Sequence, residues 1–313
     1  MIRGKVLMRK SLLIASIFLI NIAVNLHAQE RAWQPAPGKL TLPLWPNGSP
    51  SVQPDPGPEV DRSGEKNPTI AGKPVFILGN VSNPTLTVYA PAGKNSGTAV
   101  VVFPGGGYGI LAIDLEGSEV CDWLNSEGIT CILLKYRVPN EGPYPKFSGA
   151  LQDAQRTMGL VRLHAADWHI DPHKVGVLGF SAGGHLVAAL STHFDRRIYE
   201  PVDAADNLSC RPDFSALVYP AYLTAGEKSL TLKPDLPVNA QTPPAFIVQA
   251  EDDHIGVENA VSYFMALKSA NVPAELHAYA EGGHGYGLRH TSLPVTTWPR
   301  SMETWLHTVH MLP

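Results

Sequence analysis

The residues with the clearest chemical potential are Ser181 and the glycines around it. The run Gly179-Phe180-Ser181-Ala182-Gly183 follows an apolar stretch and precedes small and apolar residues at helical spacing. This context predicts a strand, a tight turn and a helix, with the serine hydroxyl held outward on the turn. The N–H of Ala182, at the start of that helix, then faces the position where an oxyanion would form. The pattern therefore predicts a nucleophilic serine.

A serine hydroxyl is a weak nucleophile at neutral pH, so this hypothesis requires a base and an orienting carboxylate. His284 is the predicted base, because it lies in the glycine-rich segment 282–287 that follows the last expected strand. Glu251, Asp252 and Asp253 adjoin one another at the end of the strand before it. All three are candidates for the carboxylate, and periodicity does not choose among them.

A second glycine cluster, Pro104-Gly105-Gly106-Gly107, ends another expected strand. Residues without side chains let backbone N–H groups approach a ligand closely. We therefore expect Gly106 and Gly107 to complete an oxyanion hole with Ala182. A phosphate loop is the alternative, but no Gly-Lys-Ser/Thr follows, and the glycine spacing does not fit a dinucleotide fingerprint.

Strand-like and helix-like patterns alternate from residue 85 onward. The expected strands are 85–89, 98–103, 129–134, 175–178, 215–219, 245–250 and 274–279. The expected helices are 119–126, 149–166, the one after Ser181, 257–269 and 298–311. Such alternation predicts an α/β domain with a mostly parallel central sheet and helices on both faces. We assign it to residues 81–313, with a surface excursion between 221 and 244.

The first 28 residues have the composition of a secretory signal peptide. Basic residues precede a mostly apolar run, which ends at the small residue Ala28. We expect cleavage near Ala28 and a secreted or periplasmic product, with an uncleaved anchor as the alternative. The residues from 29 to 80 are dense in proline and glycine and form an N-terminal extension that is expected to lie over the domain, with Leu44 and Trp45 docked on it. A proline-rich ligand for a partner protein is the rival interpretation.

Charge and cysteine content exclude several classes of protein. The net charge is −4 and no basic run lies outside the first segment, so nucleic acid is not an expected partner. Three cysteines are too few for a disulfide scaffold. Cys121 and Cys131 are expected to be buried thiols, with a bridge between them as the alternative. Asp153 and Arg156, three apart on one helix, are expected to form an ion pair.

The remaining histidines carry weaker signals. His185 and His254 lie close to the candidate site in sequence, either on the substrate side or as structural residues. Zinc binding by His164, His169 and His173 is disfavoured. We predict no metal and no cofactor.

Taken together, these segments resemble the secreted α/β-hydrolase carbohydrate esterases of bacterial plant-polysaccharide degradation. The likeness is strongest to acetyl-xylan-esterase-like proteins, some of which are labelled endo-1,4-beta-xylanase. It spans roughly residues 85–288 and rests on residues 104–108, 134–139, 179–186, 257–259 and 282–287. In this fold the triad residues follow one another as serine, acid and histidine.

The resemblance implies a triad of Ser181, Asp253 and His284, with Asp252 as the second choice for the acid. It further implies a secreted serine esterase that removes acetyl or feruloyl groups from plant polysaccharide such as xylan through an acyl-enzyme. A general small-ester carboxylesterase, a lipase-like or peptidase-like hydrolase of the same fold, and an inactive carbohydrate-binding homologue are the alternatives. The expected partner is the ester substrate, without stable membrane association after signal cleavage.

Overall fold

The computed structural model describes residues 33–51, 57–64, 69–139, 147–226 and 228–313. The predicted signal peptide lies outside these residues. The strands are β1 Leu40–Pro43, β2 Val60–Asp61, β3 Ile77–Gly79, β4 Thr85–Tyr89, β5 Ala99–Phe103, β6 Ile110–Ala112, β7 Thr130–Lys135, β8 Val175–Phe180, β9 Ser215–Val218, β10 Ala245–Ala250 and β11 Ala274–Tyr279. The helices are α2 Glu119–Ser126, α3 Ser148–Leu163, α4 Ala182–Thr192, α5 Glu258–Ser269 and α6 Trp298–Thr308, and a π-helical turn spans Asp114–Ser118.

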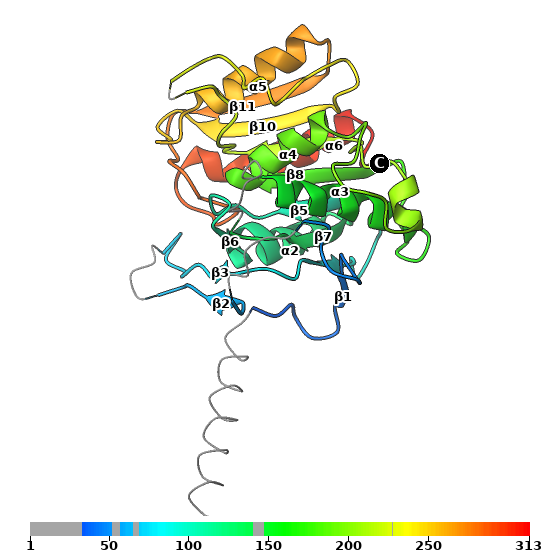
Figure 1. Cartoon of the computed structure of the whole chain (residues 1–313). Helices are drawn as coiled ribbons and strands as arrows, with labels where there is room; N and C mark the ends of the chain where they lie inside the picture. The colour runs from blue at the N-terminus through cyan, green and yellow to red at the C-terminus, as the bar shows by residue number, and fades with distance from the viewer. Residues whose placement is uncertain (1–32, 52–56, 65–68, 140–146, 227) are drawn as a thin grey trace, which may run out of the picture.

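Over the described residues, the main sheet has eight strands in the order β1-β4-β7-β5-β8-β9-β10-β11 (Figure 1). From β7 to β11 every neighbouring pair is parallel, whereas β4 pairs antiparallel with both β7 and β1. The predicted α/β class with a mostly parallel sheet is therefore confirmed. The carboxyl ends of the parallel strands meet along one edge, where open α/β sheets bind ligands.

Helices cover both faces of this sheet. A Cβ on Gly179 would lie 2.2 Å from the carbonyl oxygen of Gly183, so this residue faces α4. The next residue, Phe180, has its ring 6.0 Å from that of Trp298 on α6. Because successive strand residues point to opposite faces, α4 and α6 lie on opposite sides. Trp123 of α2 contacts Trp298, so α2 shares the α6 side, while α3 packs beside α4.

The central strands have the composition that such a position requires. All residues of β5 and β8 are buried, and both strands read as continuous apolar runs. Strands that are covered on both faces are apolar along their whole length. Polar residues therefore occur beyond the ends of these strands. Among the described residues, no helix is long and apolar enough to cross a membrane.

The N-terminal extension has more structure than its composition indicates. Regular structure was expected to begin at residue 85, and this prediction is wrong, because β1 extends the main sheet and β2, β3 and β6 form a second sheet in the described chain. These strands have two to four residues, too few for a periodic pattern, and tertiary pairing decides them. Leu44 and Trp45 are buried in the core, as expected for docked residues.

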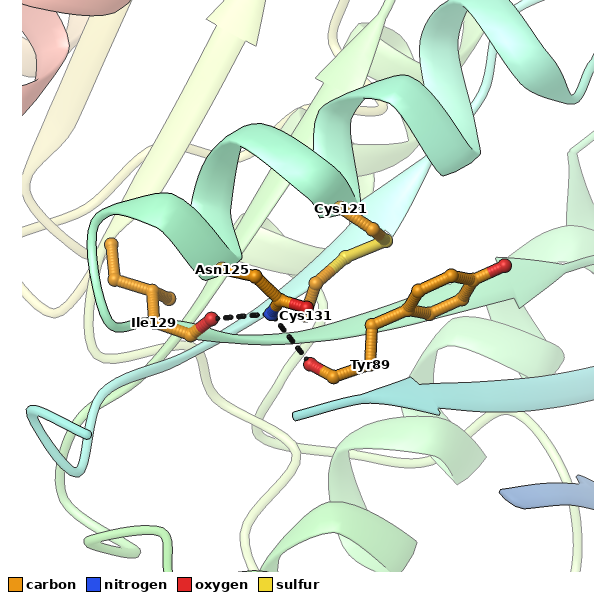
Figure 2. The surroundings of a disulfide bond; sticks show 5 residues. All are labelled: Tyr89, Cys121, Asn125, Ile129 and Cys131. Atoms are coloured by element: carbon orange, nitrogen blue, oxygen red, sulfur yellow. Dashed lines mark hydrogen bonds between the residues drawn. A yellow bond between two sulfur atoms is a disulfide. The ribbon is translucent and has the colours of Figure 1, made fainter. Parts of the chain in front are cut away.

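Cys121 and Cys131 form a disulfide, where two buried thiols were expected (Figure 2). Their Cα atoms lie 5.1 Å apart, because α2 turns back directly into β7. The side chain of Asn125 closes the same turn by donating to Ile129 O, and it also donates to Tyr89 O at the end of β4. Hydrophobic periodicity predicts that Cys121 lies on a helix and Cys131 on a strand. It does not predict how closely the helix and the strand approach each other. Cys210 is a buried free thiol.

Asp153 and Arg156 do not pair with each other as expected. Asp153 instead bonds Arg137, which lies just beyond β7, with a nitrogen to oxygen distance of 2.9 Å. Arg156 pairs with Asp203 at 2.5 Å and with Asp206 at 2.9 Å. Both side chains point away from their own helix into neighbouring segments, so tertiary partners replace the local one.

Candidate active site

Ser181 joins β8 to α4 in a strained backbone conformation, with φ 52° and ψ −116°. Non-glycine residues rarely adopt positive φ, so the surrounding contacts must hold it there. Its N–H donates to Val218 O at 3.1 Å, and its own carbonyl accepts from His185 N. A Cβ on Gly183 would lie 2.1 Å from Phe103 O, so the helix can approach β5 only because this residue has no side chain. The turn presents the hydroxyl at the carboxyl edge of the sheet.

Three predicted residues come together at this edge. His284 Nε2 lies 2.8 Å from Ser181 Oγ, and His284 Nδ1 lies 2.8 Å from Asp253 Oδ2. The buried carboxylate of Asp253 also accepts from Ile255 N and from the Gln249 amide. Burial acts to raise the pKa of Asp253, but the hydrogen bond and charge of His284 outweigh it, so that this pKa lies below its ordinary value. The carboxylate is therefore ionised at neutral pH and can orient the imidazole.

The two neighbouring acids have other positions. Asp252 Oδ1 accepts from Gly282 N at 2.9 Å and from Gly283 N at 2.7 Å, which ties the histidine loop to the end of β10. Glu251 is exposed. Of the three adjacent candidates, it is Asp253 that contacts His284, while Asp252 supports the loop that carries it.

The predicted oxyanion donors lie on the two segments that flank the serine. Gly106 and Gly107 have φ of 131° and 63°, and a Cβ on Gly106 would lie 2.2 Å from Ile110 O. Ala182 is the first residue of α4. In the described part of the chain, the N–H groups of Gly106, Gly107 and Ala182 have no hydrogen-bond partner. They are therefore available to a substrate oxygen, although their role stays a prediction.

A buried carboxylate beneath the glycine cluster was not singled out from the sequence. Glu116 lies in the π-helical turn, and its Oε2 accepts from Gly105 N at 2.6 Å. Its Oε1 accepts from the hydroxyl of Tyr219 at 2.8 Å. Burial raises the pKa of Glu116, against the effect of these hydrogen bonds. One signal was available, since Asp114 and Glu116 are acids that alternate with the apolar residues Ile113 and Leu115 shortly after the glycine cluster.

An aromatic group lines the other side of the glycine cluster. His185 is buried, with Nδ1 2.8 Å from Tyr108 Oη, and burial lowers its pKa to about 3. Tyr222 stacks on Tyr108, is 45% exposed, and its hydroxyl lies 3.5 Å from where a Cβ on Gly107 would be. His254 is exposed, with its ring 5.5 Å from that of His284. His185 is thus a buried, neutral residue, whereas His254 is exposed beside His284.

The disfavoured zinc site gains no support from the geometry. The described residues contain no group of three or more His, Cys, Asp or Glu side chains that could hold a metal ion. His164 instead stacks on Trp168, with ring centroids 5.1 Å apart.

The mostly parallel sheet, the strained serine turn and the histidine loop after the last strand together define an α/β-hydrolase. Two family descriptions match the chain and agree with this class. BD-FAE matches residues 86–215, and the prolyl oligopeptidase family matches residues 153–309.

Individual relatives narrow the class. A solved acetyl ester-xyloside bifunctional hydrolase from Caldicellulosiruptor lactoaceticus is 36% identical, with a TM-score of 0.66, over 75% of this chain and 91% of that one. An acetylxylan esterase from Xylanibacter ruminicola is 34% identical over 62% of this chain and 42% of its own length. Endo-1,4-beta-xylanase B from Butyrivibrio fibrisolvens is 28% identical over 64% of this chain and 34% of its own. The chain thus spans less than half the length of these two curated relatives.

The chain belongs to the acetylxylan-esterase-like carbohydrate esterases of the α/β-hydrolase fold. The family resemblance drawn from the sequence motifs is confirmed by these comparisons. Its homologues include proteins named acetylxylan esterase, arylesterase and esterase, all of them carboxylic ester hydrolases.

Proposed function

We propose that this protein is a serine esterase that cleaves carboxylic esters through Ser181, His284 and Asp253. The observation that carries the proposal is the continuous hydrogen-bonded series from the Ser181 hydroxyl through both nitrogens of His284 to Asp253. Each contact has the length needed for proton transfer or for orienting the imidazole. The strained serine turn adds support, because such conformations persist where the surroundings hold them for a function.

In the acylation step, Ser181 Oγ attacks the ester carbonyl carbon while His284 Nε2 takes the hydroxyl proton. The carbonyl oxygen becomes an oxyanion, which the N–H groups of Ala182, Gly106 and Gly107 are free to stabilise. Asp253 holds Nδ1 of the imidazole and stabilises the imidazolium. Collapse of the intermediate breaks the bond between the carbonyl carbon and the alcohol oxygen, and the alcohol leaves with the proton from His284.

Deacylation repeats the sequence with water as the nucleophile. His284 removes a proton from water, the hydroxide adds to the acyl carbon, and the bond to Ser181 Oγ breaks. The proton returns to Oγ, and the carboxylic acid leaves. No cofactor is needed to balance either half of the reaction.

We assign acetyl groups on xylan as the preferred substrate. The support is the similarity to two relatives, an acetylxylan esterase and an acetyl ester-xyloside bifunctional hydrolase. Feruloyl groups and simple soluble esters are the competing substrates. A panel of acetylated xylan, feruloylated arabinoxylan and p-nitrophenyl esters, scored for released acetate, ferulate and nitrophenol, decides among them.

We further propose export, with cleavage near Ala28. The support is the basic, apolar and small-residue order of the first 28 positions. N-terminal sequencing of protein from the periplasm or culture fluid should begin close to Gln29. Recovery of the product with its first residues intact on the membrane contradicts this proposal.

The activity is tested with the Ser181→Ala variant and its matched control Ser126→Ala, which changes an exposed serine at the end of α2. We expect Ser181→Ala to lower kcat for p-nitrophenyl acetate by at least ~10⁴-fold, because the nucleophile is lost. Ser126→Ala should match the wild type. A fluorophosphonate should label Ser181 in the wild type. Wild-type activity that survives in Ser181→Ala, or the absence of any esterase activity, overturns the proposal.

A further inference from the structure

The Glu116 carboxylate connects segments of the site that are distant in sequence. Its two oxygens accept from different partners, the N–H of Gly105 in the glycine cluster and the hydroxyl of Tyr219 at the end of β9. The side chain is buried, with 4% of the residue exposed. A Cβ on Gly105 would lie 2.6 Å from Oε2, so the carboxylate is packed directly against the backbone of this cluster.

Tyr219 extends the connection to the histidine loop. Its hydroxyl donates to Glu116 and accepts from Gly287 N at 3.1 Å. Its ring contacts His284 and Tyr286, with centroids 4.9 and 4.5 Å away. One buried chain of hydrogen bonds therefore runs from the loop after β5, through the π-helical turn and the end of β9, to the loop after β11.

Stability alone gives a poor account of this carboxylate. Burying a carboxylate carries a large desolvation cost, which a paired cation usually offsets. The ion pairs of the described residues do not include Glu116. Its hydrogen bonds go instead to the glycine cluster and, through Tyr219, to the loop that carries His284. The desolvation cost of the buried carboxylate therefore falls at the point where these two loops are joined.

We propose that Glu116 is a positioning residue, which fixes the glycine cluster and the His284 loop in one arrangement through Gly105 and Tyr219. The inference rests on the proposed esterase function and adds a residue to it. Gly106 and Gly107 follow Gly105 directly, so the bond to Gly105 N sets the direction in which their N–H groups point. Glu116 touches neither the substrate nor the reacting atoms. It acts on the transition state, because oxyanion donors must be aligned with the base when charge develops.

The test uses Glu116→Gln and Tyr219→Phe in the full chain. A glutamine amide offers one acceptor oxygen where the carboxylate offers two, so one of the two contacts is lost. The matched controls are Glu119→Gln, on α2 and partly exposed, and Tyr89→Phe, whose buried hydroxyl has no partner among the described residues. All variants are assayed with p-nitrophenyl acetate, and the folded active fraction is counted by fluorophosphonate titration.

We expect Glu116→Gln and Tyr219→Phe each to lower kcat, counted per titrated active site, by about 10- to 100-fold. KM should change less than about threefold, because the lost alignment matters in the transition state. The kcat of the double variant should be at most about threefold lower than that of the slower single variant, since both residues belong to one chain of contacts. The control variants should keep the wild-type kcat.

Unchanged kcat per titrated site in both Glu116→Gln and Tyr219→Phe overturns the inference, even if their thermal midpoints fall. Fully multiplicative losses in the double variant also overturn it, because they indicate independent roles. Failure of the esterase function itself is a separate outcome, seen as an inactive wild type or an active Ser181→Ala variant.

Discussion

Two buried polar regions of this protein differ in how their groups are paired. Around α3, Asp153 accepts from Arg137 and from Trp45 Nε1, and Arg156 is held by two aspartates. At the carboxyl edge of the sheet, Ser181 is strained, and the N–H groups of Gly106, Gly107 and Ala182 lack partners in the described chain.

The difference separates a cluster of paired charges from the candidate active site. Among the described residues around α3, the buried charges of Asp153 and Arg156 are each paired with an opposite charge. At the sheet edge these N–H groups have no partner in the described chain, and the segments that carry them flank a serine, histidine and carboxylate in series. Under the proposed function, a substrate oxygen supplies the missing partner. Buried charge occurs in both regions, whereas backbone strain next to N–H groups without a partner distinguishes the candidate site in the described chain.

Among the variants that compare the two regions, replacing one aspartate at the end of β10 should have the largest effect on catalysis. We expect Asp253→Asn to lower kcat by ~10⁴-fold, because the amide no longer holds the correct imidazole tautomer. Asp252→Asn keeps an oxygen that accepts from Gly282 and Gly283, so its loss should stay below about tenfold. Steady-state kinetics of both variants measure the contrast, and equal losses would break the distinction drawn between the two acids.

The opposite pattern is expected in the cluster of paired charges. Asp153→Asn leaves the buried Arg137 without its counter-charge and should lower the free energy of unfolding by about 3–5 kcal/mol. Activity per folded molecule should stay within about twofold of the wild type. Urea titration and active-site titration give the two quantities, with Asp122→Asn on the exposed face of α2 as the control. A loss of kcat with unchanged stability would place the α3 cluster in the site.

The smallest effect concerns the pH dependence of stability. Burial lowers the pKa of His185 to about 3, while an unfolded histidine titrates near 6.5. Between these values the unfolded state binds more protons, so stability falls as the pH drops through this window. His185→Gln should remove this component, making the loss between pH 6 and pH 5 about 1 kcal/mol smaller than in the wild type. Chemical unfolding at both pH values measures it, and identical slopes for the two proteins would contradict neutral burial.

Local sequence patterns predicted much of the fold and of the candidate site. Seven predicted strands of the main sheet and the surrounding helices occur within a few residues of their expected bounds. Ser181 and His284 were selected from their positions at strand ends, where topology brings them together. Position left three adjacent acids open, and the family resemblance singled out Asp253 among them. The catalytic roles of Ser181, Asp253 and His284 stay predictions that the variants above address.

What the sequence did not reveal depends on contacts between distant segments. The hydrogen-bonded network of Glu116 forms only when the ends of β5 and β9 and the loop after β11 meet around this residue. The Cys121–Cys131 bond and the partners of Asp153 likewise depend on how elements approach in space. Strands of two to four residues are too short for periodicity to detect, and their pairing partners define them.

The short N-terminal strand β1 also determines how the main sheet ends. It covers β4, a mostly buried strand that would otherwise be an edge of the described sheet. β1 itself has four residues and finishes at Pro43, which has no N–H to offer a neighbouring chain. At the other margin, β11 places Glu275 and His277 beside each other. A short strand that ends in proline and a margin with charged side chains are two features by which sheet edges disfavour pairing with a strand of another molecule.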